Sequence, residues 1–247
     1  MPEKYTTLYP VKRIHSDGRA EDTDVLLAKE CPVKLFLDGK LLTTLFASPP
    51  ELEELAVGHL VTEGILSFNE IAGIEATDNE IYIRTQREKK SAQNKSDQTF
   101  EVGRKQIFAD SHTVFELKAI FSGMDYLESD TYKLTRGTHL AALIDQKGKL
   151  AARIIDIGRH NAVDKLVGTA FLEGLNLSQH YMLSTGRQPA YMVTKAARAG
   201  IPLVATKAMP FDSGVEAAKK ANICLIGQLR QESMLVFANE WRVKKSK

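Results

Sequence analysis

The sequence predicts an α/β fold, with a smaller, mostly β amino-terminal portion over residues 1–127 and an α/β carboxy-terminal domain over residues 128–247. Short apolar runs joined by tight turns fill the first third, which has only one well-marked helix. From about residue 130, apolar strands alternate with longer helices, a pattern typical of an α/β layer with a largely parallel sheet. These later strands are almost continuously apolar, which indicates helices on both faces of the sheet.

Composition excludes several classes of protein. Hydrophobic residues make up 43% of the chain and charged residues 26%, the balance of an ordinary globular protein. A net charge of +2 gives no reason to expect a nucleic-acid partner, and no apolar run is long enough for a membrane span. Cys31 and Cys224 are the only cysteines, too few for a disulfide framework, and no secretory leader is evident. We therefore expect a cytoplasmic location.

The amino-terminal portion begins its regular pattern with a hairpin that turns at Asp38-Gly39, a strong turn signal between apolar runs. A helix follows in SPPELEELAVGHLVTEG, where Ser48 and Glu51 have the spacing of a capping box and Gly64 is a natural stop. A second hairpin is expected around Asp78-Asn79.

The rest of this portion is less regular. Residues 86–99 contain no large apolar side chain, which predicts a loop or linker. The segment VFELKAIFSGM then predicts a short helix that ends near Gly123.

The carboxy-terminal domain opens with a hairpin around Lys147-Gly148, followed by a helix from about His160 to Gly174. The strands YMLS, IPLVAT, ICLIG and MLVFA complete the chain, with the helices PAYMVTKAARAG and SGVEAAKKA between the first three of them. In such sheets ligands lie beyond the carboxyl ends of strands, where loops lead into helices.

The first such loop is Asp156-Ile157-Gly158-Arg159-His160-Asn161, between a strand and a helix. Glycine allows close backbone approach, and the amide groups of a helix start favour an anion. His160 and Asp164 share a helical face, as do Asn161 and Lys165. A surface helix start with a capping Asn and an Asp–Lys pair would explain these residues equally well.

The second loop, Ser184-Thr185-Gly186-Arg187, offers hydroxyls, a glycine and a cation for a phosphate or carboxylate. A plain turn uses the same residues. Tyr191, one helical turn later, could stack on a base or pterin or could belong to the core.

A third loop, Thr135-Arg136-Gly137-Thr138-His139, leads into a strand, and Lys207 follows another. A lone histidine at a strand start is usually structural. No histidine has zinc-site spacing, so we expect no metal site. Rossmann, P-loop and hydrolase signatures are also missing.

Taken together, several segments resemble the formate dehydrogenase accessory protein family (FdhD). They are ELAVGHLVTEGI, TRGTHLAAL, IDIGRHNAVDKLVG, STGRQPAYMVTKAARAGIP and CLIGQLRQESMLVFA, and the resemblance covers roughly residues 30 to 240. It implies a cytidine-deaminase-like α/β/α carboxy-terminal domain that binds a ligand. The chain lacks the H-x-E and P-C-x-x-C zinc signature, which argues against deamination.

The resemblance also implies a function: a sulfur carrier of sulfurtransferase type for a molybdenum cofactor. Family members are understood to take a persulfide from a cysteine desulfurase and pass the sulfur to molybdopterin guanine dinucleotide for formate dehydrogenase. A bound guanine nucleotide is implied too, and a homodimer is compatible with the family. The cofactor-binding positions expected from the loops and the resemblance are Arg136, His139, Gly158, Arg159, His160, Asn161, Lys165, Ser184, Gly186, Arg187, Lys207, Gln228, Arg230 and Ser233.

The chain departs from the family where the sulfur chemistry is carried. The family places a C-x-x-C pair ahead of a helix, whereas the matching segment here contains Ala109, Ser111 and His112. A persulfide needs an accessible, low-pKa thiolate, and Cys31 and Cys224 belong to apolar strand patterns expected to be buried. No catalytic residue is assigned, and we predict that the chain cannot carry a persulfide by itself.

Three functions therefore stay open. The first is the family's sulfur carriage, and the second is a cofactor- or nucleotide-binding paralogue without sulfur transfer. The third is a different enzyme on the same scaffold that uses His112, His139 or His160 as acid–base groups.

Overall fold

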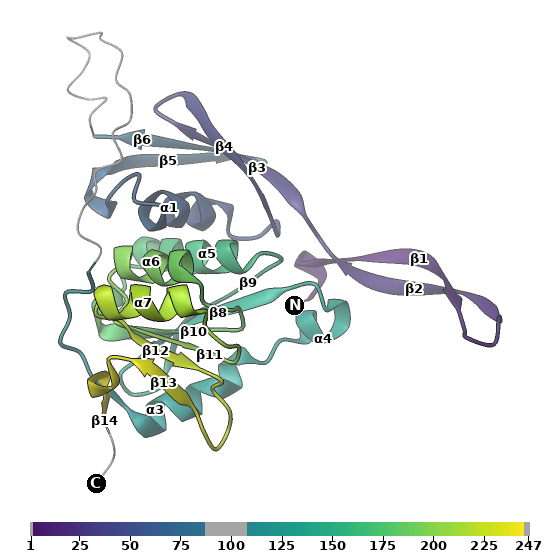
Figure 1. Ribbon diagram of the computed structural model, residues 1–247. Helices are drawn as coiled ribbons and strands as arrows, with labels where there is room; N and C mark the ends of the chain where they lie inside the picture. The colour runs from purple at the N-terminus through teal and green to yellow at the C-terminus, as the bar shows by residue number, and fades with distance from the viewer. Residues whose placement is uncertain (1, 87–107, 245–247) are drawn as a thin grey trace.

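The computed structural model describes residues 2–86 and 108–244 and shows a mixed α/β protein. The predicted α/β class is confirmed. A six-stranded sheet lies at the centre, a four-stranded sheet packs on helix α1, and a two-stranded ribbon extends away from the rest (Figure 1). The predicted loop at 86–99 lies outside the described residues except for Gln86. The division near residue 128 stays a prediction.

The central sheet has the strand order β13-β12-β11-β10-β8-β9. Its strands are β8 His139–Asp145, β9 Leu150–Asp156, β10 His180–Ser184, β11 Leu203–Thr206, β12 Cys224–Gly227 and β13 Leu235–Ala238. Only the pairs β10–β11 and β11–β12 are parallel, so the expectation of a largely parallel sheet is wrong. The reason is loop length: β8 and β9 are joined by the predicted hairpin, and the link from β12 to β13 is too short for a helical crossover.

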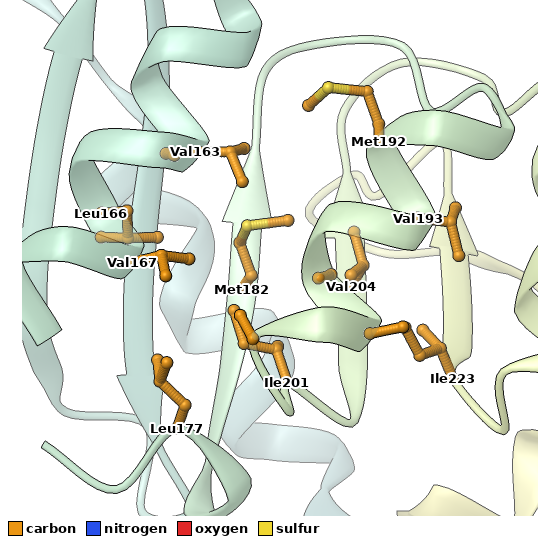
Figure 2. Packing of buried hydrophobic residues seen from close by; sticks show 14 of the residues in the cluster. Val163, Leu166, Val167, Leu177, Met182, Met192, Val193, Ile201, Val204 and Ile223 are labelled. Atoms are coloured by element: carbon orange, nitrogen blue, oxygen red, sulfur yellow. The ribbon is translucent and has the colours of Figure 1, made fainter. Parts of the chain in front are cut away.

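Helices cover both faces of this sheet, as predicted. On one face α5, α6 and α7 pack over side chains such as Met182 and Val204 (Figure 2). On the other face α3 and neighbouring turns cover the sheet (Figure 1). The helices are α5 Arg159–Leu172, α6 Ala190–Arg198, α7 Asp212–Lys220, α3 Leu117–Ser122 and α4 Asp130–Thr135. Short 3-10 turns lie at Gly123–Leu127, Leu177–Gln179 and Glu240–Arg242. Alternate residues of each strand therefore belong to two separate cores.

The amino-terminal sheet has the order β4-β3-β6-β5 and packs on α1. Its elements are β3 Cys31–Leu37, β4 Lys40–Ala47, α1 Leu52–Thr62, a 3-10 turn at Phe68–Glu70, β5 Ile71–Thr77 and β6 Glu80–Thr85. Both predicted hairpins are confirmed, and Asp38, Gly39 and Asp78 have the positive φ angles such turns require. The predicted capping box is wrong: Glu51 is the residue that precedes α1, in a left-handed conformation and without a side-chain cap.

The remaining elements belong to neither of these two sheets. They are a 3-10 turn at Pro2–Lys4, β1 Thr6–Ile14, β2 Ala20–Ala28, β7 Phe115–Glu116 and β14 Val243–Lys244. Strands β1 and β2 pair only with each other, and β7 pairs with β14. Within the described residues no helix is long and apolar enough to cross a membrane.

Candidate functional site

Loops from five strands gather at one edge of the central sheet. Strands β9, β10, β11 and β12 end there, and the antiparallel strand β8 begins there. The register of the strands places these ends together, because His139 lies opposite Asp156 and Ser184 lies opposite Thr206. We call this set of loops the strand-end site: residues 136–139, 156–161, 184–188, 206–208 and 228–233. The predicted site residues therefore lie at one edge of the sheet, apart from Lys165, which lies further along α5.

Contacts tie the first three loops together around Thr185 and Gly186. The Thr185 hydroxyl lies 3.4 Å from His139 Nδ1 and accepts a hydrogen bond from the Leu140 amide at 3.0 Å. A Cβ added to Gly186 would lie 3.0 Å from the Cβ of Arg159, so only glycine permits this approach without displacing the arginine. Gln188 Nε2 donates to the Gly186 carbonyl at 3.0 Å.

The strand-end site also holds unpaired polar atoms. Among the described residues, the buried side-chain nitrogen and oxygen atoms without a hydrogen-bond partner are Thr138 Oγ1, Arg159 Nε, His160 Nε2 and Gln188 Oε1. All four belong to residues at this edge of the sheet. Burying a polar atom without a partner costs about 1–3 kcal/mol, which makes this edge of the sheet the candidate site.

Two histidines lie at this edge of the sheet, His139 and His160, and both have shifted pKa values. Burial lowers the pKa of His139 and of His160, and the nearby Arg159 guanidinium lowers both pKa values further. Both imidazoles are therefore favoured in the neutral form. Arg159 also donates to the Tyr191 hydroxyl at 2.7 Å, and the ring of Tyr191 lies 4.9 Å from that of His160.

Two residues near the start of α5, Asn161 and Lys165, contact other parts of the protein. Lys165 Nζ lies 2.7 Å from Asp156 Oδ2, and both side chains are fully buried. Lys165 also donates to the carbonyls of Ser48 and Pro50, and Asn161 donates to the Phe46 carbonyl. This network joins the loop after β9 to the segment between β4 and α1.

The alternative of a surface helix start with an Asp–Lys pair does not describe this region. Asp164 is buried and pairs with Lys195 of α6 at 2.8 Å, with His59 and Thr62 of α1 as further partners. The pKa of Asp164 is lowered by the hydrogen bond from His59 and by Lys195, against the opposing effect of burial. Asp164 and Lys165 thus each pair with a distant residue.

The last two loops, together with Met124, Asp125 and Glu128, line a hollow of about 680 Å³. Its lining includes Lys207, Arg230 and Ser233, while Lys207 Nζ lies 3.0 Å from Glu128 Oε1. Arg187 lies over the Phe211 ring at 5.2 Å and is exposed. Arg136 occupies a left-handed position after α4 and is also exposed.

The segment that replaces the expected cysteine pair lies at the opposite edge of the sheet. Ala109 donates its amide to the Ala221 carbonyl just before β12, and Ser111 donates its hydroxyl to the Ser178 carbonyl just before β10. The structure therefore does not bring Ala109, Ser111 or His112 to the strand-end site.

The two cysteines differ from each other. Cys224 is fully buried, and burial raises the pKa of its thiol to about 12. Cys31 packs against the core of the amino-terminal sheet but is only partly buried, so the buried position expected for it is confirmed only in part. Burial raises the pKa of the Cys31 thiol, with Lys165 acting in the opposite direction. Cys31 thus lies near the Asp156–Lys165 pair, on the side of the loop after β9.

Comparison with known proteins identifies the family. Residues 28–244 match the model of the FdhD/NarQ family. The chain belongs to the FdhD/NarQ family. It is 32% identical to Protein FdhD of Methanocaldococcus jannaschii, with 88% of this chain and 90% of that protein covered. Sulfur carrier protein FdhD of Bacillus subtilis is 28% identical, with 99% of this chain and 100% of that protein covered.

A solved structure agrees with the fold of this family member. A crystal structure from Desulfotalea psychrophila, described as a formate dehydrogenase accessory protein, superposes with a TM-score of 0.84 at 24% identity. The match covers 97% of this chain and 100% of that one. The family match and the relatives confirm the resemblance inferred from the sequence, and this structure agrees in fold.

Three residues outside the predicted set of binding positions also lie at this site: Asp156 and Thr138, which belong to two of the candidate loops, and Gln188, which follows the remaining one. Thr138 and Gln188 carry unpaired atoms, and Asp156 holds Lys165 and the loop amides in place. The sequence indicates the loop that contains Thr138 but gives no reason to single out its hydroxyl or the amide of Gln188, since neither residue belongs to a charge pattern. Within the described residues, no three His, Cys, Asp or Glu side chains gather in the way a metal site needs.

Proposed function

We propose that this chain acts as an FdhD-type accessory protein in the maturation of formate dehydrogenase and binds molybdopterin guanine dinucleotide at the strand-end site. The observation that carries this proposal is the set of unpaired buried atoms on Thr138, Arg159, His160 and Gln188. Membership of the FdhD/NarQ family supports it, as do the names of the relatives.

The residue types suit such a ligand. Arg159, Arg187 and Lys207 supply cationic donors for phosphate groups, which Arg recognises well because its planar fork matches their oxygens. A base or pterin edge carries both donors and acceptors, and the Gln188 carbonyl and a neutral His160 can meet these. We propose that the other predicted residues of the strand-end site position Arg159, His160, Arg187, Gln188 and Lys207 around the ligand.

Neither cysteine of this chain has both the exposure and the low pKa that sulfur transfer requires. Carriage requires a thiolate to attack a sulfur donor and form a persulfide. The buried Cys224 is unsuited, whereas Cys31 lies partly exposed beside the Asp156–Lys165 pair. Of the two thiols, Cys31 is therefore the one accessible enough for carriage, and the alternative is a chain that holds the cofactor without carrying sulfur.

The finer expectations belong to this proposal as well. We propose a cytidine-deaminase-like arrangement of the carboxy-terminal layers, in accord with helices on both faces of the mixed sheet. A cysteine desulfurase as sulfur donor and a cytoplasmic location complete the proposal. Both follow from the family role and the low cysteine content.

Complementation tests the proposal. The chain is expressed in a bacterial strain that lacks its own FdhD, and formate dehydrogenase activity is measured. We expect activity to return with wild type and to fall with Gln188→Leu. If wild type restores none while a C-x-x-C relative does, the proposed accessory function is contradicted.

The cysteine variants separate the two candidates. Wild type, Cys31→Ala and Cys224→Ala are incubated with a cysteine desulfurase and labelled cysteine, followed by non-reducing separation. Label retained on wild type and lost only in Cys31→Ala assigns carriage to Cys31. Absence of label on every form supports binding of the cofactor without sulfur transfer.

A further inference from the structure

The starts of helices α5 and α6 meet at the strand-end site, because β9 and β10 both end at this edge of the sheet. Arg159 is the first residue of α5, and Tyr191 lies in the first turn of α6. The sequence left Tyr191 either to stack on a ligand or to belong to the core. In the structure Tyr191 is 47% exposed while the next two residues, Met192 and Val193, are fully buried. Tyr191 is therefore not a core residue.

The side chain of Arg159 is held at both ends. The Tyr191 hydroxyl accepts a hydrogen bond from Arg159 Nη2 at 2.7 Å, a short distance typical of a charged donor. Gly186 lies against the aliphatic stem, since a Cβ on this glycine would lie 3.0 Å from Arg159 Cβ and 3.1 Å from Arg159 Cδ. A free arginine has many rotamers, and losing them when a ligand binds reduces affinity. The structure removes much of that freedom before any ligand arrives.

Part of the Arg159 guanidinium is nevertheless left without a partner. Arg159 Nε is buried and unpaired, and so is Nε2 of the neighbouring His160. The ring of Tyr191 lies 4.9 Å from the His160 ring, so one tyrosine contacts both residues. Arg159 also lowers the pKa values of His139 and His160, which agrees with a guanidinium that lies within the strand-end site.

The charge of Arg159 indicates an anionic ligand group. Among the described residues, no carboxylate oxygen lies within 4.0 Å of its guanidinium, and Tyr191 is the side chain to which it donates. Lys207, by contrast, pairs with Glu128 at 3.0 Å. A planar guanidinium with unused N–H groups matches the oxygens of a phosphate group. Arg159 is thus a fixed cation that no anion of the protein neutralises.

We infer that Tyr191 is a positioning residue, which holds the Arg159 guanidinium in place for a phosphate group of the ligand. This inference rests on the proposed function, because the ligand proposed there carries phosphate groups. Tyr191 acts through Arg159 and makes no contact with the phosphate itself. Without the Tyr191 hydroxyl the cation stays in the site but is free to move, so affinity falls while the fold is kept.

A double-mutant cycle tests this inference, with guanosine diphosphate titrated into the intact protein by calorimetry. Tyr191→Phe keeps the ring and loses only the hydroxyl, and it should weaken binding about three- to tenfold. In an Arg159→Met background there is no guanidinium to hold, so the same change should alter affinity less than about twofold. A role of Tyr191 in packing alone, or direct contact with the ligand, would weaken binding in both backgrounds.

Two further measurements complete the test. Inorganic pyrophosphate carries the phosphate groups without the base and should lose affinity for Tyr191→Phe by a similar factor. Tyr9→Phe removes the hydroxyl of another exposed tyrosine, in β1, and should match wild type. Thermal unfolding of Tyr191→Phe should also match wild type, since the residue is half exposed.

The outcomes separate this inference from the proposed function. If wild type binds guanosine diphosphate and Tyr191→Phe binds it equally well, the proposed function stands and the positioning role is overturned. Equal losses in both backgrounds, or a loss for guanosine diphosphate but not for pyrophosphate, would overturn it too. If wild type binds no guanosine diphosphate, the proposed function fails and this inference fails with it.

Discussion

Lys165 Nζ and Asp156 Oδ2 lie 2.7 Å apart, and neither side chain reaches solvent. Asp156 also accepts the amides of Ser48 and Gly158, while Lys165 donates to the carbonyls of Ser48 and Pro50. One buried pair thus holds the loop after β9 against the segment that leads into α1. The strand-end site depends on this loop for Arg159 and His160.

Breaking that pair should be costly. In Lys165→Met the Asp156 carboxylate loses its buried cation, which typically costs about 3–5 kcal/mol. The free energy of unfolding, measured by denaturant titration, should fall by that amount. Lys12→Met breaks an exposed pair of the same 2.7 Å distance and should cost no more than about 1 kcal/mol. Equal losses in both variants would show that the buried pair has no special role.

Acid should destabilise the protein through the site histidines. Burial lowers the pKa values of His139 and His160 below the unfolded value of 6.5. The unfolded chain therefore binds protons first, so this contribution is present above pH 6.5 and is lost as the pH falls through the folded pKa values. Unfolding free energies at pH 7.5 and 5.5 should differ less in His160→Gln than in wild type. An unchanged or larger difference would refute this account.

Helices α1 and α5 approach too closely for a side chain at two positions. A Cβ on Gly168 would lie 1.9 Å from the Glu54 carbonyl oxygen, and one on Gly58 would lie 1.7 Å from that of Asp164. Gly168→Ala should therefore lower the unfolding free energy by about 1–3 kcal/mol or more, because the backbones must separate. Gly137→Ala meets only ordinary contacts and should be close to neutral. A stable Gly168→Ala protein would contradict the close approach.

Thiol reactivity should separate the two cysteines. Cys224 is fully buried with a pKa raised to about 12, so an alkylating reagent should modify it only as the protein unfolds. Cys31 is partly exposed and should react in the folded state. Peptide mass spectrometry after timed labelling reads both rates. Faster labelling of Cys224 than of Cys31 would be inconsistent with the structure.

Local signals predicted much of this fold. The turn at Asp38-Gly39 needs only two residues that accept positive φ, and the hairpin formed as expected. The strand-end loops were also visible, because strand and helix patterns fix which end of each strand they follow. Each of these loops is only a few residues long and lies next to a strand or helix that the sequence pattern reveals.

Long-range contacts explain the predictions that the structure contradicts. Ser48 did not cap α1, because its hydroxyl accepts from the Ile157 amide and its own amide donates to Asp156, more than one hundred residues away. The Lys165 side chain turns inward for the same reason. The unpaired atoms of Thr138 and Gln188 depend on packing between loops, which no local pattern encodes.

Titration calorimetry of guanosine diphosphate with the intact protein tests the central claim, a guanine nucleotide held at the strand-end site. Wild type should bind, and Arg187→Ala should bind roughly ten- to a hundredfold more weakly, since a charge-assisted hydrogen bond contributes about 1.5–3 kcal/mol. Arg84→Ala, which removes an exposed arginine of β6, should match wild type. No binding by wild type, or equal affinity in wild type and Arg187→Ala, would contradict the account.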